Sequence, residues 1–66
     1  MRYRVETWDA RGRQCLTVWR GAWRYFLRDN AEDPDLCRAV ARLNTDSPAL
    51  VLGGGASPIT RITREI

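Results

Sequence analysis

The stretch Arg2–Arg20, RYRVETWDARGRQCLTVWR, decides the fold because it has the pattern of a β-hairpin. From Tyr3 to Thr7 every second residue is apolar or β-branched, the period of two expected of a strand that buries one face. Residues 9–12, DARG, place Asp first and Gly fourth, as type I turns favour. A second strand, antiparallel to the first, is therefore expected over residues 13–20.

A four-residue turn sets a register in which Val5 pairs with Leu16 and Tyr3 with Val18, which gives the hairpin one apolar face. The opposite face is then rich in tryptophan and arginine, and we call it the Trp/Arg face: Arg2, Arg4, Trp8, Arg13 and Trp19. The alternative is that a helix covers this side of the hairpin and that Trp19 belongs to the core.

A short helix is expected over residues 22–28, AWRYFLR, directly after Gly21. Its apolar side chains fall on one side and Arg24 and Arg28 on another, the arrangement of an amphipathic helix. Together with Arg20, these two arginines could extend the basic surface of the hairpin. A solvated helix face is the commoner reason for such a pair.

The second helix has the clearest boundary signals in the sequence. Asp33 can cap its N-terminus, Pro34 suits its first position, and Asp35 complements the positive end of the helix dipole. Asn44 is its expected end. Its apolar stripe consists of Leu36, Ala39, Val40 and Leu43.

The C-terminal part predicts a second hairpin. Residues 49–52, ALVL, have the composition of a buried strand, and a glycine triplet at 53–55 follows it. Residues 59–66 have isoleucines at helical spacing, but five of the eight are β-branched, which favours a strand. We expect a strand there, with a C-terminal helix as the alternative. The glycines predict a tight or bulged turn, since a phosphate loop would need a lysine after them.

These elements predict one α+β domain over residues 1–66, in the order ββααββ. It would be a small antiparallel sheet with two short helices packed on one face. A chain of 66 residues is near the lower limit for independent folding, since it buries only about 60% of its unfolded surface. Such a core leaves no room for a sizeable active-site cavity.

Composition and the first six residues lead us to expect a globular cytoplasmic protein. The chain is 44% hydrophobic and 29% charged, and no run approaches the roughly 20 apolar residues of a membrane span. Residues 1–6 lack the apolar segment of a signal peptide. Cys15 and Cys37 are expected to be reduced and to serve as small apolar residues.

The residue types argue against an enzyme or a metalloprotein. The chain has no histidine, so neither a Ser-His-Asp nor a Cys-His arrangement can be built. The two cysteines lie about twenty residues apart without a CxxC motif, which matches no structural zinc site. The aspartate pair Asp33 and Asp35 needs no catalytic role, because aspartate is favoured at the start of a helix. No cofactor is expected.

The charge is distributed unevenly along the chain. All eleven basic residues are arginine, which a GC-rich genome explains most simply, although arginine also suits bidentate contact with phosphate and carboxylate. Residues 1–28 contain seven arginines against two carboxylates, a net charge of +5. Residues 29–47 contain five carboxylates against two arginines, a net charge of −3. The basic end is therefore the N-terminal half.

Two functions of different classes are compatible with these features. The first is a non-enzymatic adaptor or inhibitor that docks on an acidic protein or nucleoprotein surface, like the small motif-free domains with which phages and mobile elements block host machinery. The alternative is a nucleic-acid binder that uses the same surface. A net charge of only +3 and the acidic stretch 29–46 favour the first. Self-association could accompany either, and no membrane partner is expected. The candidate binding residues are Arg2, Arg4, Trp8, Arg13, Trp19, Arg24 and Arg28.

Overall fold

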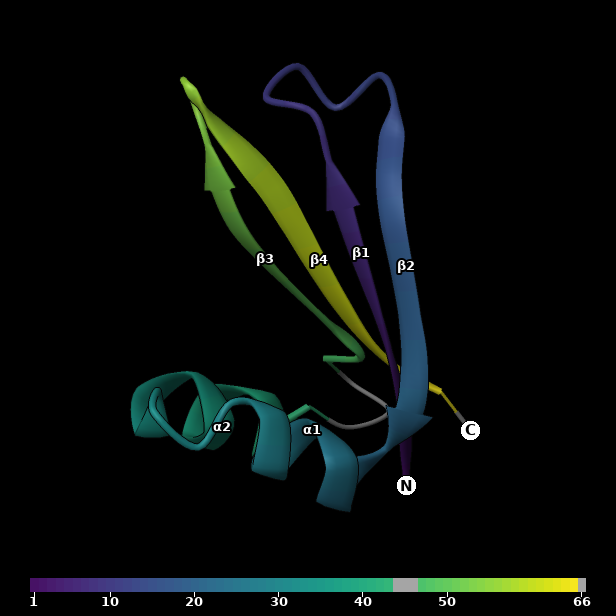
Figure 1. The fold of residues 1–66 in the computed structure, drawn as a ribbon, viewed down its shortest axis with the longest axis vertical. Coiled ribbons are helices and arrows are strands. Elements are labelled where there is room, and N and C mark those ends of the chain that lie inside the picture. Colours follow the sequence, from purple (N-terminus) through teal and green to yellow (C-terminus); the bar gives the residue numbers. More distant parts are fainter. Residues whose placement is uncertain (44–46, 66) are drawn as a thin grey trace.

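The computed structural model describes residues 1–43 and 47–65. Within these residues, an antiparallel sheet of four strands and two helices follow one another in the order ββααββ (Figure 1). The predicted α+β architecture is therefore confirmed. The elements are β1 (Arg2–Trp8), β2 (Cys15–Ala22), α1 (Trp23–Asp29), α2 (Pro34–Ala41), β3 (Ala49–Gly54) and β4 (Ser57–Glu65).

The strands lie in the order β2-β1-β4-β3, so the first and last strands of the chain are central and β2 and β3 form the two edges. β3 and β4 make the second hairpin, which confirms the strand expected from residue 59 onward as far as Glu65. The last predicted residue, Ile66, lies outside the described residues. The predicted glycine turn is formed by Gly55 and Ala56, whereas Gly53 and Gly54 still belong to β3, and the register shifts between these two glycines.

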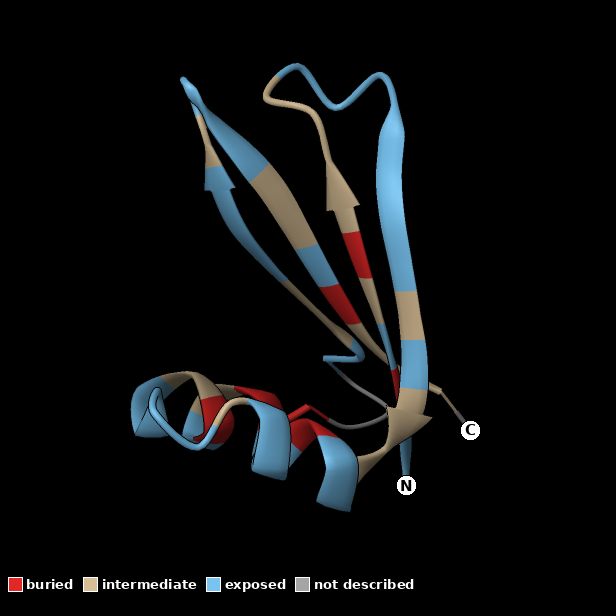
Figure 2. Cartoon of the chain, viewed as in Figure 1, coloured by how far each residue is buried: buried red, intermediate tan, exposed pale blue. Residues whose placement is uncertain are grey.

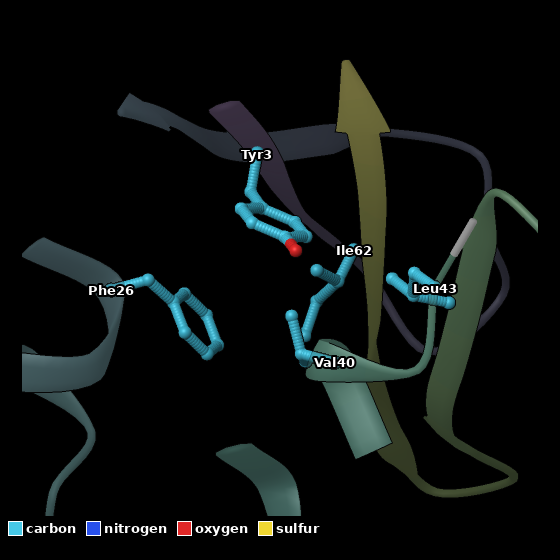
Figure 3. Close-up of a cluster of buried hydrophobic side chains, with 5 residues drawn as sticks. All are labelled: Tyr3, Phe26, Val40, Leu43 and Ile62. Atoms are coloured by element: carbon cyan, nitrogen blue, oxygen red, sulfur yellow. The ribbon is translucent and has the colours of Figure 1, made fainter. Parts of the chain in front are cut away.

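Both helices lie at one end of the sheet, the end where β1 begins and β4 finishes (Figure 1). They are held there by a small core of buried side chains from both layers. In Figure 3 these side chains converge between the strands and the helices: Tyr3, Phe26, Val40, Leu43 and Ile62. A chain of this length buries only a small hydrophobic core, and here that core lies at one end of the sheet.

The start of the second helix is as predicted. The Asp33 carboxylate accepts a hydrogen bond from the backbone N–H of Leu36 at 3.2 Å, and Pro34 occupies the first turn. The helix ends at Ala41, earlier than the predicted end at Asn44, which itself lies outside the described residues. The expected stripe packs on the core through Val40, Leu43 and, less completely, Leu36.

The predicted register of the first hairpin is wrong. Val5 pairs with Trp19 and not with Leu16, and Tyr3 pairs with Gly21 and not with Val18. An odd shift of three residues exchanges the two faces of β2. Trp19 therefore lies on the helix-covered face, while Val18 lies on the opposite face.

The turn explains this shift. Asp9 and Gly12 form the expected tight turn, since the Gly12 N–H donates to the Asp9 carbonyl oxygen at 2.9 Å. The Asp9 carboxylate also accepts hydrogen bonds from the backbone N–H groups of Arg13 and Gln14, at 2.7 and 3.3 Å. These bonds keep two more residues in the loop. β2 therefore starts at Cys15, two residues later than predicted.

The two cysteines differ in their surroundings. Cys37 is buried in α2, as expected of a small apolar residue, whereas Cys15 is exposed at the start of β2. Both thiols are free. No helix in the described part of the chain is long and apolar enough to cross a membrane.

Candidate functional site

The residues of the predicted Trp/Arg face do not form one surface. Three of them occupy even-numbered positions of β1 and therefore lie on the same face of the sheet, the one that the helices leave open: Arg2, Arg4 and Trp8. Trp19 lies on the opposite face, because it pairs with Val5. Arg13 is exposed in the turn that joins β1 to β2.

Trp19 packs against the core, so the alternative considered for this residue is confirmed. Its ring centroid lies 6.2 Å from that of Phe26. The indole also lies over Gly21, where a Cβ atom would approach Trp19 Cζ2 to 2.7 Å. The ring stays half-buried, and its remaining surface borders two hollows of the molecule.

The first hollow is a shallow depression of about 450 Å³ where the end of β2 leads into α1. Four arginines from three elements surround it, accompanied by two aromatic rings and one carboxylate. We call it the basic groove. Its side-chain lining consists of Arg2, Arg20, Arg24, Arg28, Trp19, Tyr25 and Asp29, and Ala22 and Gly21 complete it.

The α1 side of the basic groove is built around Tyr25. Arg24 and Arg28 are four residues apart and therefore lie on the same side of the helix. Their Cζ atoms lie 4.8 and 5.2 Å from the centroid of the Tyr25 ring, within cation–π distance. Arg24 Nη2 also donates a hydrogen bond to the Tyr25 hydroxyl at 3.1 Å. Two guanidinium groups and a ring that is 40% exposed thus form one cluster.

The sheet side of the basic groove is ordered by an ion pair. Arg20 Nε and Nη2 donate to the two carboxylate oxygens of Glu65, at 3.0 and 2.6 Å. This hydrogen-bonded pair raises the pKa of Arg20 and lowers the pKa of Glu65. Arg2 and Arg4 lower the pKa of Glu65 further through their charge. The pair spans β1, since Arg20 belongs to β2 and Glu65 to β4.

The basic groove keeps a net positive charge after its ion pairs are taken into account. Arg20 is paired with Glu65, and Arg28 Nε lies 3.3 Å from Asp29 Oδ1. Both guanidinium groups are still well exposed, at 58% and 69% of their side-chain surface. Four arginines therefore face two carboxylates, and Arg24 contacts the Tyr25 ring and hydroxyl.

The second hollow is an apolar cleft of about 370 Å³ between the helices and the sheet. Its lining is mostly core side chains that the short helices cover incompletely, among them Val5, Trp19, Phe26, Leu36 and Ile62, and the exposed Leu52 adds to it. Asp29 is the single ionisable group among its lining residues. Within residues 1–43 and 47–65, no cluster of three or more histidine, cysteine, aspartate or glutamate side chains could hold a metal ion.

The open face of the sheet carries apolar side chains that the sequence had assigned to the core. Val18 is 51% exposed and Val51 on β3 is 60% exposed, and Leu16, the extra residue of a β-bulge in β2, is 52% exposed. Figure 2 shows exposed residues along most of β2. The one buried charge of the described residues, Glu6, lies among them and pairs with Arg4 at 3.3 Å.

Sequence reasoning thus found part of the basic groove and missed part of it. Arg2, Trp19, Arg24 and Arg28 were candidates and do line the groove, whereas Arg4, Trp8 and Arg13 are not among its lining residues. Tyr25 was missed. Its position beside Arg24 and three residues before Arg28, on an expected helix, is a signal that could have identified it.

No family model matches this sequence, and no significant match to it was found among curated proteins or solved structures.

Proposed function

We propose that this chain is a non-enzymatic binding protein that docks on an acidic surface of a protein or nucleoprotein through the basic groove. The observation that supports this proposal is the gathering of four arginines with Trp19 and Tyr25 around one depression. Arginine, tryptophan and tyrosine are the residues most enriched in the energetically dominant parts of protein interfaces. This assignment moves the binding surface from the predicted Trp/Arg face to the end of β2 and the outer side of α1.

Acidic side chains of a partner would be recognised by pre-positioned guanidinium groups. Arg24 and Arg28 are held against the Tyr25 ring, and Arg20 is held by Glu65, so each loses less side-chain freedom on binding. A guanidinium group can bind a carboxylate through two parallel hydrogen bonds, which gives such contacts direction as well as strength. An inhibitor of host machinery, of the class encoded by phages and mobile elements, would need only a stable shape and a cluster of this kind.

Nucleic-acid binding is the second candidate, and the exposed ring of Tyr25 favours it. A base could stack on this ring while Arg24 and Arg28 contact the phosphates, the combination typical of single-strand binding. The carboxylates of Asp29 and Glu65, which pair with Arg28 and Arg20 of the groove, weigh against a polyanion. They make a protein surface, with carboxylates at separate points, the better fit.

The groove is tested with a charge-reversed protein and a matched control. In Arg24→Glu/Arg28→Glu two groove arginines are reversed, and in Arg11→Glu/Arg13→Glu two exposed arginines of the β1–β2 turn are reversed with the same change in net charge. We expect the wild type and the turn variant to capture the same partner from a nuclease-treated host lysate, and the groove variant to lose it. Equal capture by the groove variant and the wild type would contradict the proposal.

The two candidate functions are separated by titration with mixed-sequence single- and double-stranded nucleic acid, followed by Trp fluorescence and anisotropy at two salt concentrations. The docking proposal predicts no binding at physiological salt. Tight binding that falls steeply with salt, and that is lost in Arg24→Glu/Arg28→Glu only, would instead establish the nucleic-acid function, because counterion release gives such a salt dependence.

A further inference from the structure

The floor of the apolar cleft is one row of side chains across the sheet. Trp19 pairs with Val5, and Val5 pairs with Ile62, so the three lie side by side on the face of the sheet that the helices partly cover. Phe26 of α1 and Leu36 of α2 form the opposite wall. The cleft is therefore apolar on the side of the sheet and on the side of the helices.

The cleft opens toward the next row of the sheet, which lies beyond the helices. In this row Thr7 pairs with Thr17 and with Thr60, and Thr60 pairs with Leu52. Both helices lie toward the other end of these strands, and they leave Thr17 and Leu52 exposed (Figure 1). Thr60 and Leu52 also border the cleft. A side chain of another molecule can therefore enter the cleft from this row.

The apolar cleft and the basic groove meet at two residues. Trp19 and Asp29 line both hollows. The indole is half-buried, and the Asp29 side chain is 50% exposed beside Arg28. An extended segment that crosses the Trp19 ring would contact both hollows, with the groove arginines at one end and the apolar walls at the other.

We infer that the partner docks here through a short extended segment in which one large apolar side chain stands close to acidic ones. The inference rests on the proposed function, since the acidic residues are those that the basic groove would bind. The apolar side chain fills the cleft while the carboxylates contact the arginines. The two kinds of residue lie within about four positions of each other, because the hollows meet at one indole and an extended chain advances only about 3.3 Å per residue.

The chemistry of each hollow favours its own part of this segment. Burial of an apolar side chain between apolar walls is favourable, and a cleft of about 370 Å³ has room for one leucine or aromatic side chain. The net positive charge of the basic groove favours carboxylates beside it. Asp29 at the junction would repel a carboxylate and can accept a hydrogen bond from a backbone N–H. The residue of the segment that crosses the junction is therefore expected to be uncharged.

The segment is tested by selection of random peptides, displayed on phage, against the intact protein. We expect the enriched peptides to carry a large apolar residue within about four positions of acidic residues. Enrichment of acidic peptides with no apolar requirement would overturn this inference and leave the proposed function standing. Peptides that are only apolar would contradict the basic groove as well, and the absence of any enriched peptide would also overturn the inference.

A substitution in the wall of the cleft tests where the apolar residue binds. Leu52→Gln removes an exposed apolar side chain without a change of charge, and Val51→Gln is its matched control, because Val51 is exposed on the other face of the same strand. The dissociation constant of a selected peptide, measured by fluorescence anisotropy, should rise at least about fivefold in Leu52→Gln and little in Val51→Gln. Equal effects of the two substitutions would overturn the inference.

A second substitution fills the cleft and leaves its walls intact. Thr60→Phe places a ring in the cleft, and Thr63→Phe places the same ring on the opposite face of β4. Circular dichroism shows that each variant is folded, and only Thr60→Phe should lose the selected peptide. Wild-type affinity in folded Thr60→Phe would overturn the inference. A wild type that sedimented as a dimer, and that the peptide dissociated, would assign the cleft to a second copy and overturn it as well.

Discussion

Gly21 determines where the largest side chain of β2 lies. A Cβ atom at this position would come within 2.7 Å of Cζ2 and 2.9 Å of Cη2 in the indole of Trp19. The ring can therefore lie flat along its own strand and reach Phe26 only because residue 21 has no side chain. Both hollows share Trp19 in their lining, so this contact shapes the binding surface as well as the core.

We expect Gly21→Ala to lower the free energy of unfolding by about 1–3 kcal/mol, the usual cost of overpacking against a rigid ring. The Trp fluorescence should change as the indole is displaced. Urea unfolding followed by circular dichroism measures the effect. In a Trp19→Phe background the two clashing ring atoms are absent, so the same substitution should cost much less there. An equal cost in both backgrounds would show that the contact with Trp19 is not the cause.

At the scale of elements, the sheet is held across its width by the ion pair of Arg20 and Glu65. The pair joins the edge strand β2 to β4 over the central strand β1. It also fixes the sheet side of the basic groove. Glu65 is the last residue of β4, so the pair ties the end of this strand to the edge of the sheet.

The ion pair predicts a pH dependence of stability. The pKa of Glu65 is lowered below its ordinary value of 4.5, chiefly by the hydrogen bond from Arg20. A lowered pKa in the folded state stabilises the protein above the ordinary pKa, and this contribution is lost as the pH falls through the lowered pKa. Glu65→Gln should therefore lower the melting temperature at neutral pH, and the difference from the wild type should vanish in acid.

Thermal melts from neutral pH down to about pH 2 measure this convergence. Glu32→Gln is the control, because it removes the same charge from an exposed residue in the connector between the two helices. Its melting curves should follow those of the wild type at every pH. If Glu65→Gln and the wild type had the same melting temperature at neutral pH, the pair would contribute no stability.

At the scale of the whole molecule, one small core supports both layers. Its centre is Ile62, which is 1% exposed and connects the central strand β4 to the helices through Val40. A domain of this size gains only about 3–5 kcal/mol from such a core. The loss of one central side chain is therefore comparable with the total stability.

Ile62→Ala is expected to cost about 2–5 kcal/mol, because it removes buried methyl groups and leaves a cavity. A large fraction of the protein should then be unfolded at ambient temperature in the absence of denaturant. Val51→Ala, at a position 60% exposed, should change the free energy of unfolding by no more than about 0.5 kcal/mol. Urea titration followed by circular dichroism compares the two. Similar unfolding midpoints for both variants would contradict a single central core.

Much of the fold follows from local features of the sequence. The alternation in β1, the Asp9–Gly12 turn, the Asp33 cap and the glycine triplet each predict one element, and each element is present. These signals are local because a turn, a cap or a strand pattern depends on hydrogen bonds and dihedral angles within a few residues. Together they determine the ββααββ order and the α+β class by themselves.

The register of the first hairpin, and with it the composition of each surface, could be read only from the three-dimensional structure. The Asp9 carboxylate retains Arg13 and Gln14 in the loop, and the packing of Trp19 on Phe26 selects the face that the helices cover. Period-two alternation is equally compatible with either face, so the sequence pattern could not choose between them. For the same reason the basic groove, which joins β1, β2 and α1, became visible only once the strands were paired and the helices were in place.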